Sequence, residues 1–284
     1  MSAIADRAEA FRRLHRGPSI LVLPNAWDAA SAAVFAASGF PAVATSSGAV
    51  AFAAGYPDGE QMPREQMLAS LERICAAVDV PVTADIEKGY GSTPEEVAET
   101  VRLVIEAGAV GVNLEDGLGP SGAPALRPVA EQLERLRAAR RAAEAVGVPL
   151  FVNARTDVYL AGIGEPAERV GLAIERAAAY AKGGADGVFV PGVVEADAIR
   201  AIASAVPAPL NVFIRPGLPS LAELHALGVA RLSLATAPIL ATLGLLRKIS
   251  RELLETGTYT ALQVDVVAYP EMQGLFAGRR GRPG

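Results

Sequence analysis

The protein has 284 residues, of which 51% are hydrophobic and 20% charged, and a formal net charge of -5. This apolar content excludes an intrinsically disordered chain, and the single cysteine, Cys75, excludes a disulfide scaffold and favours a reducing, cytoplasmic location. The acidic balance argues against nucleic acid as a partner, because phosphate binding needs a basic surface.

Neither the N-terminal residues nor the most apolar stretches have the pattern of a targeting or membrane segment. Residues 1–16 mix charged residues with alanine and lack the apolar core of a signal peptide, which predicts a short amphipathic N-terminal helix. The most apolar windows, residues 36–55 and 228–246, are interrupted by glycine, proline, serine or arginine. We therefore expect no membrane-spanning helix and no membrane partner.

Short β-branched runs alternate along the chain with segments rich in alanine, glutamate and arginine that have a helical period. This alternation is typical of repeated βα units around a parallel sheet. The eight predicted strands are residues 20–23, 42–45, 82–85, 111–114, 150–154, 187–190, 210–214 and 231–234. The predicted helices between them include residues 63–78, 94–107, 128–146, 165–182, 195–205 and 220–226.

Glycine and proline mark the starts of these strands in an alternating pattern. Even-numbered strands follow a helix-ending glycine (Gly39, Gly108, Gly184 and Gly228), and odd-numbered strands follow a proline (Pro81, Pro149 and Pro209). The alternation predicts an α/β fold, a closed (β/α)8 TIM barrel over residues 17–245. A C-terminal helical extension over residues 246–275 and a disordered tail over residues 276–284 are expected to follow.

The active site of a TIM barrel lies at the C-terminal ends of its strands, and in this sequence those positions are acidic. Asp85, Glu87 and Glu115 follow neighbouring strands, and Asp58 lies in the loop after the second strand. Carboxylates that cluster in a half-buried site repel one another unless a cation lies among them. Oxygen ligands without histidine or cysteine select a hard ion, which predicts a site for Mg²⁺ or Mn²⁺.

Other polar residues at the same end have two readings each. Asp28 and Asp116 are expected to cap helices or pair with arginines, because each stands at a helix start or beside a better metal ligand. Arg155 ends the fifth strand and suits bidentate capture of a substrate carboxylate. The alternative for Arg155 is a structural pair with Glu115 or Asp157.

Ser46, Ser47 and Gly48 offer consecutive backbone N–H groups and hydroxyls. No histidine base stands near them in the sequence, so an anion-binding role is favoured over a serine nucleophile. Asn211 adds a polar side chain at the seventh strand. Trp27 either lines the substrate pocket or packs in the core.

Five motifs in this order resemble the isocitrate lyase/phosphoenolpyruvate mutase superfamily, over about residues 10–254. They are residues 24–32 (PNAWDAASA), 45–48 (TSSG), 85–91 (DIEKGYG), 111–116 (GVNLED) and 153–156 (NART). The resemblance implies a Mg²⁺-dependent enzyme that acts on a small 2-oxo or 2-hydroxy carboxylic acid through an enolate.

The resemblance also implies roles for single residues. Asp85 would bind the metal directly, while Asp58, Glu87 and Glu115 would hold its waters. Ser46, Ser47, Gly48 and Arg155 would bind the substrate carboxylate. Together with residues chosen for their position in the sequence, the predicted substrate-binding residues are Trp27, Ser46, Ser47, Gly48, Asp85, Arg155 and Asn211, and the catalytic candidates are Asp58, Arg155 and Tyr90. The superfamily further implies a homo-oligomer, a dimer or tetramer in which the terminal helix from residue 246 is exchanged between subunits.

The loop after the fourth strand departs from the family pattern. Lyases of the superfamily carry a Lys-Lys-Cys-Gly-His sequence there, whereas residues 117–127 contain no cysteine, lysine, histidine or asparagine. Tyr90, Ser121 and Arg127 are the nearby alternatives for a proton donor. The expected activity is a carbon–carbon lyase acting on a di- or tricarboxylate. A phosphonomutase, a 2-oxo-dicarboxylate hydrolase and a non-catalytic 2-oxo-acid-binding protein stay open.

Overall fold

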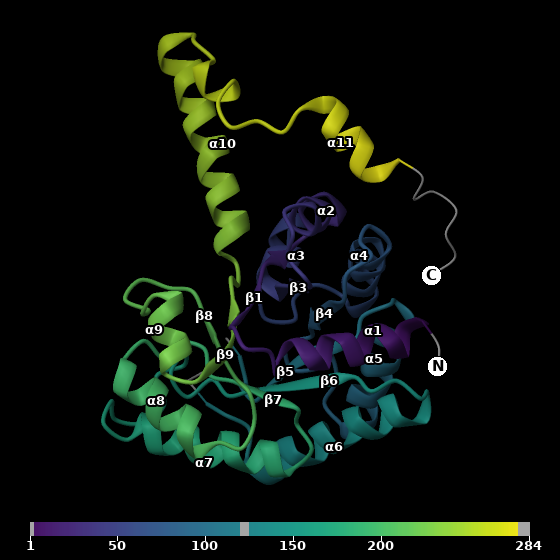
Figure 1. The fold of residues 1–284 in the computed structure, drawn as a ribbon, viewed down its shortest axis with the longest axis vertical. Coiled ribbons are helices and arrows are strands. Elements are labelled where there is room, and N and C mark those ends of the chain that lie inside the picture. Colours follow the sequence, from purple (N-terminus) through teal and green to yellow (C-terminus); the bar gives the residue numbers. More distant parts are fainter. Residues whose placement is uncertain (1–2, 120–124, 278–284) are drawn as a thin grey trace.

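The computed structural model describes residues 3–119 and 125–277 (Figure 1). Within them, nine parallel strands form one sheet in the order β1-β9-β8-β7-β6-β5-β4-β3-β2. The strands are β1 (Leu21–Leu23), β2 (Asn25–Ala26), β3 (Val43–Thr45), β4 (Val82–Asp85), β5 (Gly111–Glu115), β6 (Phe151–Arg155), β7 (Gly187–Phe189), β8 (Leu210–Phe213) and β9 (Val229–Ser233). Each predicted strand overlaps an observed one, and β2 is additional.

The two ends of the sheet belong to one stretch of chain. β1 pairs with β9 and β2 pairs with β3, and only Pro24 separates β1 from β2. Proline has no N–H group to donate to a sheet, which accounts for the break at this position. The strands therefore form a nearly closed ring, and the predicted TIM barrel is confirmed.

The Asn25 side chain joins the two edges at this break. Its Nδ2 donates to the Thr45 carbonyl at 2.8 Å, at the end of β3. Its Oδ1 accepts from the backbone N–H groups of Leu234 at 2.8 Å and Ala235 at 2.9 Å, just after β9. A buried carboxamide thus bridges the two edges at the end of the barrel where the active site was predicted.

Helices surround the ring (Figure 1). They are α1 (Ala3–Leu14), α2 (Ala29–Ala37), α3 (Ser47–Ala53), α4 (Arg64–Ala76), α5 (Pro94–Glu106), α6 (Val129–Ala145), α7 (Arg169–Lys182), α8 (Ala196–Ala205), α9 (Leu221–Ala226), α10 (Ala237–Thr256) and α11 (Tyr269–Phe276), with a short 3-10 helix at Thr260–Leu262. The outward strand residues Val112, Val152 and Val188 are fully buried under these helices. Apolar burial of this kind stabilises the sheet and leaves the barrel axis to other side chains.

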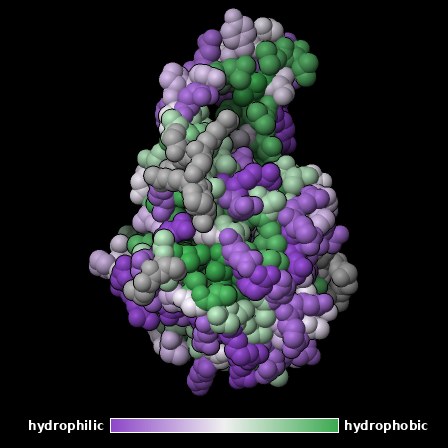
Figure 2. All heavy atoms as spheres, turned by 90° about the vertical axis from the view of Figure 1, so that its right-hand side faces the viewer, coloured by the Kyte–Doolittle hydropathy of each residue, from purple (hydrophilic) through white to green (hydrophobic). Residues whose placement is uncertain are grey.

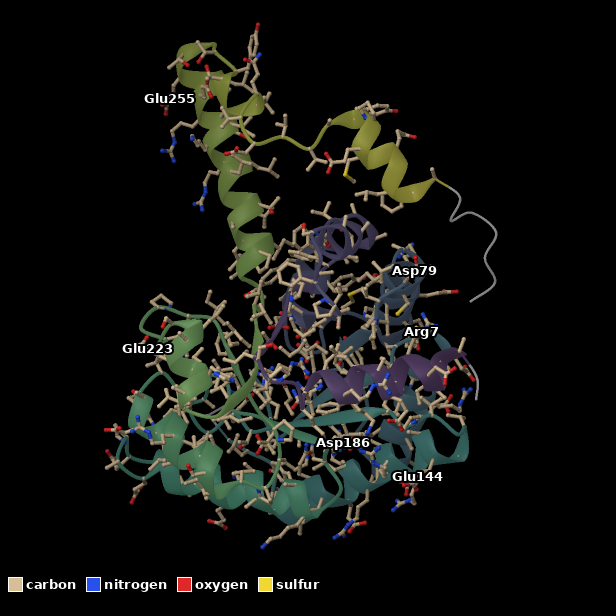
Figure 3. The ribbon with its side chains drawn as sticks, in the orientation of Figure 1. Arg7, Asp79, Glu144, Asp186, Glu223 and Glu255 are labelled. Carbon is tan, nitrogen blue, oxygen red and sulfur yellow. The ribbon has the colours of Figure 1, made fainter. Side chains whose placement is uncertain are left out.

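The N-terminal helix α1 lies against the end of the barrel opposite the predicted site. Phe11 and His15 pack on Phe151, with ring centroids 5.6 Å and 3.8 Å away. Asp186, labelled in Figure 3, forms an ion pair of 2.6 Å with Arg12 of α1. The same carboxylate pairs with Arg140 of α6. The predicted N-terminal helix is therefore part of the barrel structure, because it covers one end of it.

The C-terminal part projects away from the barrel. α10 begins at Ala237, directly after β9, whereas the sequence predicted a helix from Leu246. The last helix, α11, contacts α2. The predicted disordered tail falls largely on residues 278–284, outside the described residues. Figure 2 shows hydrophobic surface on the projecting part, where Leu243, Leu246 and Leu254 are exposed.

No helix in residues 3–119 or 125–277 is both long and apolar enough to cross a membrane.

Candidate active site

A cavity of about 180 Å³ lies at the C-terminal ends of the strands. Its polar lining is Asn25, Ser46, Ser47, Asp58, Asp85, Asn113, Arg155, Ser233 and Thr236, and its apolar lining is Leu160, Phe189, Pro191, Phe213 and Ala235. This is the end of a TIM barrel at which substrates bind. The structure thus brings together Ser46, Ser47, Asp58, Asp85 and Arg155 from the predicted site.

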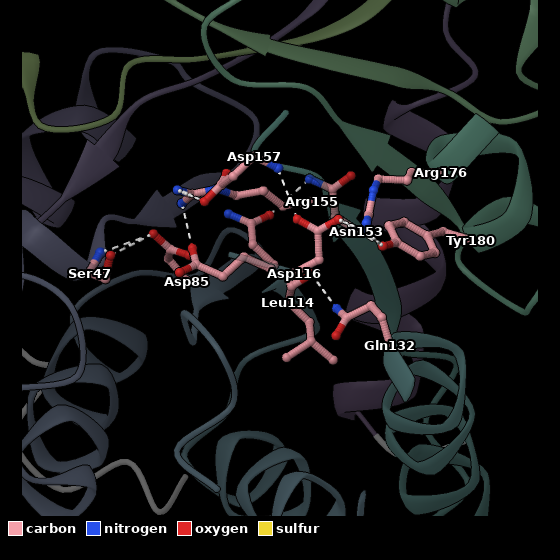
Figure 4. Close-up of polar contacts among 12 residues, drawn as sticks. Ser47, Asp85, Leu114, Asp116, Gln132, Asn153, Arg155, Asp157, Arg176 and Tyr180 are labelled. Carbon is pink, nitrogen blue, oxygen red and sulfur yellow. Dashed lines mark hydrogen bonds and ion pairs between the residues drawn. The ribbon is translucent and has the colours of Figure 1, made fainter. Parts of the chain in front are cut away.

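Asp85 is held at the end of β4 with one oxygen saturated and the other free. Its Oδ2 accepts from the backbone N–H of Ser47 at 3.2 Å and from the Ser47 hydroxyl at 2.9 Å (Figure 4). Its backbone N–H donates to Thr45 Oγ1 at 2.9 Å. Its Oδ1 is buried and has no hydrogen-bond partner among the described residues. A buried carboxylate oxygen without a partner is costly, so this atom fits a cation ligand.

Two further acids reinforce the negative potential at this point. Burial, and then the charge of Asp85, raises the pKa of Asp58. Burial, and then the charges of Asp85 and Asp58, raises the pKa of Glu87 to about 8. Crowded carboxylates with raised pKa values are what a bound divalent cation would offset.

The acidic side chains do not come close enough together to be direct ligands of one metal ion. Across the described ranges, no three His, Cys, Asp or Glu side chains form a group that could hold a metal together. Mg²⁺ keeps several waters and commonly takes only one or two carboxylates directly. The arrangement therefore fits a hydrated ion with Asp85 as a direct ligand better than direct coordination by all four predicted acids.

Arg155 is both a cavity residue and the centre of an ion-pair network. Its Nε and Nη2 donate to Asp157 at 2.6 Å and 3.0 Å, and its Nη1 donates to Glu115 at 2.8 Å (Figure 4). Burial alone would lower the Arg155 pKa, but Glu115 and Asp157 hold it well above its usual value. The structural pairing and the cavity position thus coexist, and the N–H groups that these bonds do not use stay available to a ligand.

Asp116 and Asp28 have the structural roles that the sequence favoured. Asp116 accepts from the backbone N–H of Asp157 at 2.9 Å, from Arg176 at 3.0 Å and from the Tyr180 hydroxyl at 2.7 Å. Asp28 forms the N-cap of α2 and accepts from the Ser31 N–H at 2.7 Å. Both expectations are confirmed, and neither residue lines the cavity.

Six predicted site residues do not line the cavity: Trp27, Gly48, Glu87, Tyr90, Glu115 and Asn211. Glu115 is buried and pairs with Arg155. Gly48 is in the first turn of α3, where a Cβ atom would stand 2.9 Å from Asp58 Oδ2. Trp27 packs against Val50 and Met62 in a small apolar cluster. Asn211 is buried beneath the cavity and accepts from the Ser233 hydroxyl at 3.2 Å.

Tyr90 and Glu87 also lie outside the lining. The Tyr90 hydroxyl lies 3.4 Å from Glu87 Oε1, and Tyr90 lines a neighbouring hollow rather than the cavity. Of the other two proton-donor alternatives, Arg127 also lines that hollow and Ser121 falls outside the described residues.

Glu87 and Tyr90 lie on a loop of unusual backbone geometry. Both have positive φ angles, 50° and 51°, which non-glycine residues adopt only at a cost. Arg135, buried on α6, donates to the carbonyls of Lys88, Gly91 at 2.9 Å and Ser92 at 3.1 Å. One guanidinium thus fixes the loop that positions two predicted site residues.

Several cavity residues were not singled out from the sequence. Asn25 and Asn113 stand at strand ends, a signal that also marked the acids, but an amide alone indicates no specific chemistry. Phe189 and Phe213 close one wall, with rings 6.3 Å apart, and their place follows only from knowing which strand residues face inward.

Comparison with known proteins gives the chain its relatives. It is 35% identical over 228 residues to an uncharacterized protein of Mycobacterium tuberculosis, covering 80% of this chain and 82% of that protein. It is 29% identical over 214 residues to the 2-methylisocitrate lyase of Bacillus subtilis, covering 74% of this chain and 67% of that protein. A solved structure of a candidate lyase/mutase from Burkholderia cenocepacia superposes with a TM-score of 0.89 at 40% identity, over 97% of each chain.

The profile of the phosphoenolpyruvate phosphomutase family matches residues 11–254, the same stretch that carries the barrel and α10. The chain therefore belongs to the phosphoenolpyruvate phosphomutase family, within the isocitrate lyase/phosphoenolpyruvate mutase superfamily.

Proposed function

We propose that the protein is a Mg²⁺-dependent carbon–carbon lyase that cleaves a small 2-hydroxy or 2-oxo di- or tricarboxylate through the enolate of a 2-oxo acid. The observation that carries the proposal is Asp85, whose Oδ1 is buried and has no partner in the described part of the chain, while Ser47 donates twice to its Oδ2. Asp58 and Glu87 add negative charge around the same point. These residues would hold Mg²⁺, which supplies charge stabilisation for an enolate oxygen.

The chain's own residues would bind and orient the substrate. Arg155 would hold a substrate carboxylate through the N–H groups that its pairs with Glu115 and Asp157 do not use. Ser46, Ser47 and Gly48 form the turn beside it, with Ser46 and Ser47 in the lining. Phe189, Phe213 and Leu160 exclude water from one side, which strengthens every charge interaction in the cavity.

Proton transfer is assigned to two groups. Asp58 lines the cavity, and its burial beside Asp85 raises its pKa, so it would be the carboxyl group that exchanges a proton with the substrate. Tyr90 would act through Glu87, which its hydroxyl approaches to 3.4 Å. Trp27 and Asn211 would shape the site from outside the lining.

A hydrolase or phosphonomutase is the second candidate. The hydrolase is supported by the loop over residues 117–127, which carries no cysteine, lysine, histidine or asparagine to serve as the acid. In a 2-oxo-dicarboxylate hydrolase, a water molecule would take the place of that residue. A protein that binds 2-oxo acids without turnover is the third candidate.

Calorimetry with oxalate, a planar mimic of a 2-oxo-acid enolate, tests the binding part of the proposal. Oxalate is expected to bind in the presence of MgCl2 and not in its absence, and Asp85→Asn is expected to abolish this binding. Asp28→Asn is the matched control, because asparagine caps a helix as well as aspartate does and Asp28 does not line the cavity. Oxalate binding that is independent of Mg²⁺ and unchanged in Asp85→Asn would overturn the proposal.

A product screen by mass spectrometry separates the three candidates. The wild-type protein would be incubated with 2-hydroxy dicarboxylates, oxaloacetate and phosphonopyruvate, each with Mg²⁺. Release of a 2-oxo acid from a 2-hydroxy dicarboxylate supports the lyase. Turnover of oxaloacetate or phosphonopyruvate alone supports the second candidate. Oxalate binding without any product supports the binding protein.

We also propose that the working form is a homo-oligomer, a dimer or tetramer, in which α10 packs on a second subunit. The support is the exposure of leucines along α10: Leu240, Leu243, Leu245, Leu246, Leu253 and Leu254. A projecting helix with so much exposed apolar surface is expected to be covered by a partner.

A further inference from the structure

Arg231 is a charged residue sealed inside the barrel, and the proposed function does not yet use it. It lies on β9, two residues before the cavity residue Ser233, and is 1% exposed. Its hydrogen-bond partners are neutral: Nε donates to Ser233 Oγ at 3.2 Å and Nη2 donates to Asn113 Oδ1 at 3.4 Å. Its Nη1 has no partner among the described residues.

A buried guanidinium in this position lowers the stability of the folded protein. Burial lowers the Arg231 pKa to about 9, and Asp85 is the acid whose charge opposes that shift. Removing a charge from water costs several kcal/mol unless an opposite charge or a full set of hydrogen bonds compensates it. Asp85 and two neutral acceptors compensate this cation only in part, so its place one layer below the cavity calls for a role other than stability.

That role follows from the fact that arginine can only donate hydrogen bonds. The atom of Asn113 that faces Arg231 must therefore be its acceptor, Oδ1. The same oxygen accepts from Asn153 Nδ2 at 2.9 Å, on the neighbouring strand, so it is satisfied by two donors. The amide nitrogen of Asn113 is left for the cavity that this residue lines.

The donor-only character of Arg231 also fixes the orientation of the Ser233 hydroxyl. Because Ser233 Oγ accepts from Arg231, its proton is directed to Asn211 Oδ1, 3.2 Å away. One donor-only side chain thus fixes the orientation of a hydroxyl and two amides below and beside the cavity. The floor of the site then presents an N–H donor, which matches an anionic oxygen.

We infer that Arg231 is a positioning residue that holds the Asn113 amide with its N–H group toward an anionic oxygen of the bound substrate. Asn113 is thereby a substrate-binding residue in addition to those already assigned. The inference rests on the proposed function, because it takes the ligand to be a carboxylate or enolate in the cavity beside Asp85.

The test uses the full-length protein, MgCl2 and oxalate as the probe, with affinity from calorimetry and Tm from thermal unfolding. Arg231→Met is expected to weaken oxalate binding by about tenfold or more, the usual effect of losing a hydrogen bond to a charged group. Its Tm is expected to stay equal or rise, because an unpaired buried charge is removed. Arg231→Lys, which keeps a donor for Asn113 Oδ1, is expected to restore part of the affinity.

A second variant distinguishes the orientation of the Asn113 amide from a general contribution of this residue to stability. Asn113→Asp keeps acceptors toward Arg231 and Asn153 and pairs the buried cation, so the Tm is expected to rise. It has no N–H donor, so oxalate affinity is expected to fall by about tenfold or more. Thr83→Val is the matched control, since Thr83 is a buried polar residue of the barrel interior whose hydroxyl has no partner in the described chain. It is expected to bind oxalate as the wild type does.

The outcomes separate the inference from the proposed function. Failure of the wild type to bind oxalate with Mg²⁺ counts against the proposed function itself. Binding by the wild type together with unchanged affinity in Arg231→Met and Asn113→Asp overturns the inference alone. A Tm that falls in proportion to affinity in both variants, with no gain from Arg231→Lys, assigns Arg231 a supporting role and also overturns it.

Discussion

Gly48 and Asp58 are in such close contact that a Cβ atom on residue 48 would lie 2.9 Å from Asp58 Oδ2 and 3.0 Å from its Cγ. The absence of a side chain on α3 therefore lets the loop carboxylate reach the cavity. This gives the glycine of the TSSG motif a physical reason: it makes room for an acid of the site.

Gly48→Ala is accordingly expected to displace Asp58 and weaken Mg²⁺-dependent oxalate binding by about tenfold, the scale of a 1–3 kcal/mol overpacking cost. Calorimetry on the folded variant measures this. Gly171→Ala on α7 is the control, because nothing lies within 4 Å of its added Cβ and alanine favours a helix. Equal oxalate affinity in Gly48→Ala and wild type would contradict the role given to this contact.

Arg135→Met is expected to lower the free energy of unfolding by about 2–5 kcal/mol, since it leaves three loop carbonyls without their donor. Urea denaturation measures the loss. Because the same carbonyls fix the loop that carries Glu87 and Tyr90, Mg²⁺-dependent oxalate binding is expected to weaken as well. Arg137→Met on the exposed side of α6 is the control, and it should change neither quantity. A destabilised Arg135→Met that binds oxalate normally would separate the loop from the site.

His15 is expected to make the fold sensitive to acid. Its burial, and then the charge of Arg231, lowers its pKa from the usual 6.5 to about 3. Between these values the unfolded chain binds a proton that the folded protein does not. Stability is therefore complete above about pH 6.5 and falls as the pH decreases toward 3, by up to about 1.4 kcal/mol per pH unit.

His15→Phe is expected to remove that contribution, because phenylalanine keeps the stacking on Phe151 without a titrating group. The difference in unfolding free energy between wild type and variant, measured in urea at pH 7.5, 6 and 5, should grow in favour of the variant as the pH falls. His225→Gln, at an exposed position, is the control. A difference that does not change with pH would show that His15 titrates normally.

The double substitution Leu246→Glu and Leu253→Glu is expected to dissociate the proposed oligomer, because it places charges on the exposed apolar face of α10. Sedimentation velocity would report the fall in mass. Lys248→Glu, which changes charge at an exposed position of the same helix without removing apolar surface, should leave the assembly intact. A wild-type protein that sediments as a monomer at micromolar concentration would refute the oligomer.

The alternation of glycine and proline before the strands predicted the barrel correctly, because the end of a helix and the start of a strand depend on the backbone preferences of a few neighbouring residues. It did not predict β2, which exists because Pro24 interrupts a strand that must pair on both sides. The start of α10 was placed nine residues late, since the apolar residues after Ala237 resemble a buried strand–helix junction rather than a projecting helix.

The charged residues of the candidate site could be predicted from the sequence. The distance of each polar residue from the cavity along the barrel axis could not. Asp85, at a strand end, and Asp58, in the loop after the second predicted strand, were identified because clustered acids need a cation among them, and both line the cavity. Asn211 and Asn113 are both polar strand residues whose side chains face the barrel interior, yet of the two only Asn113 lines the cavity. The difference is one barrel layer, which depends on strand stagger and is invisible in the residue types.

The break at Pro24 has a mechanical consequence. Around most of the ring, neighbouring strands are held by backbone ladders, but between β2 and the end of β9 the connection at the cavity is the Asn25 carboxamide. Ala235 and Thr236, which follow β9 in the cavity wall, therefore lie next to a side-chain bridge rather than a backbone ladder. Asp85 and Arg155 stand on strands joined by continuous backbone pairing, so the ladder of β4, β5 and β6 sets their spacing across the cavity without help from Asn25.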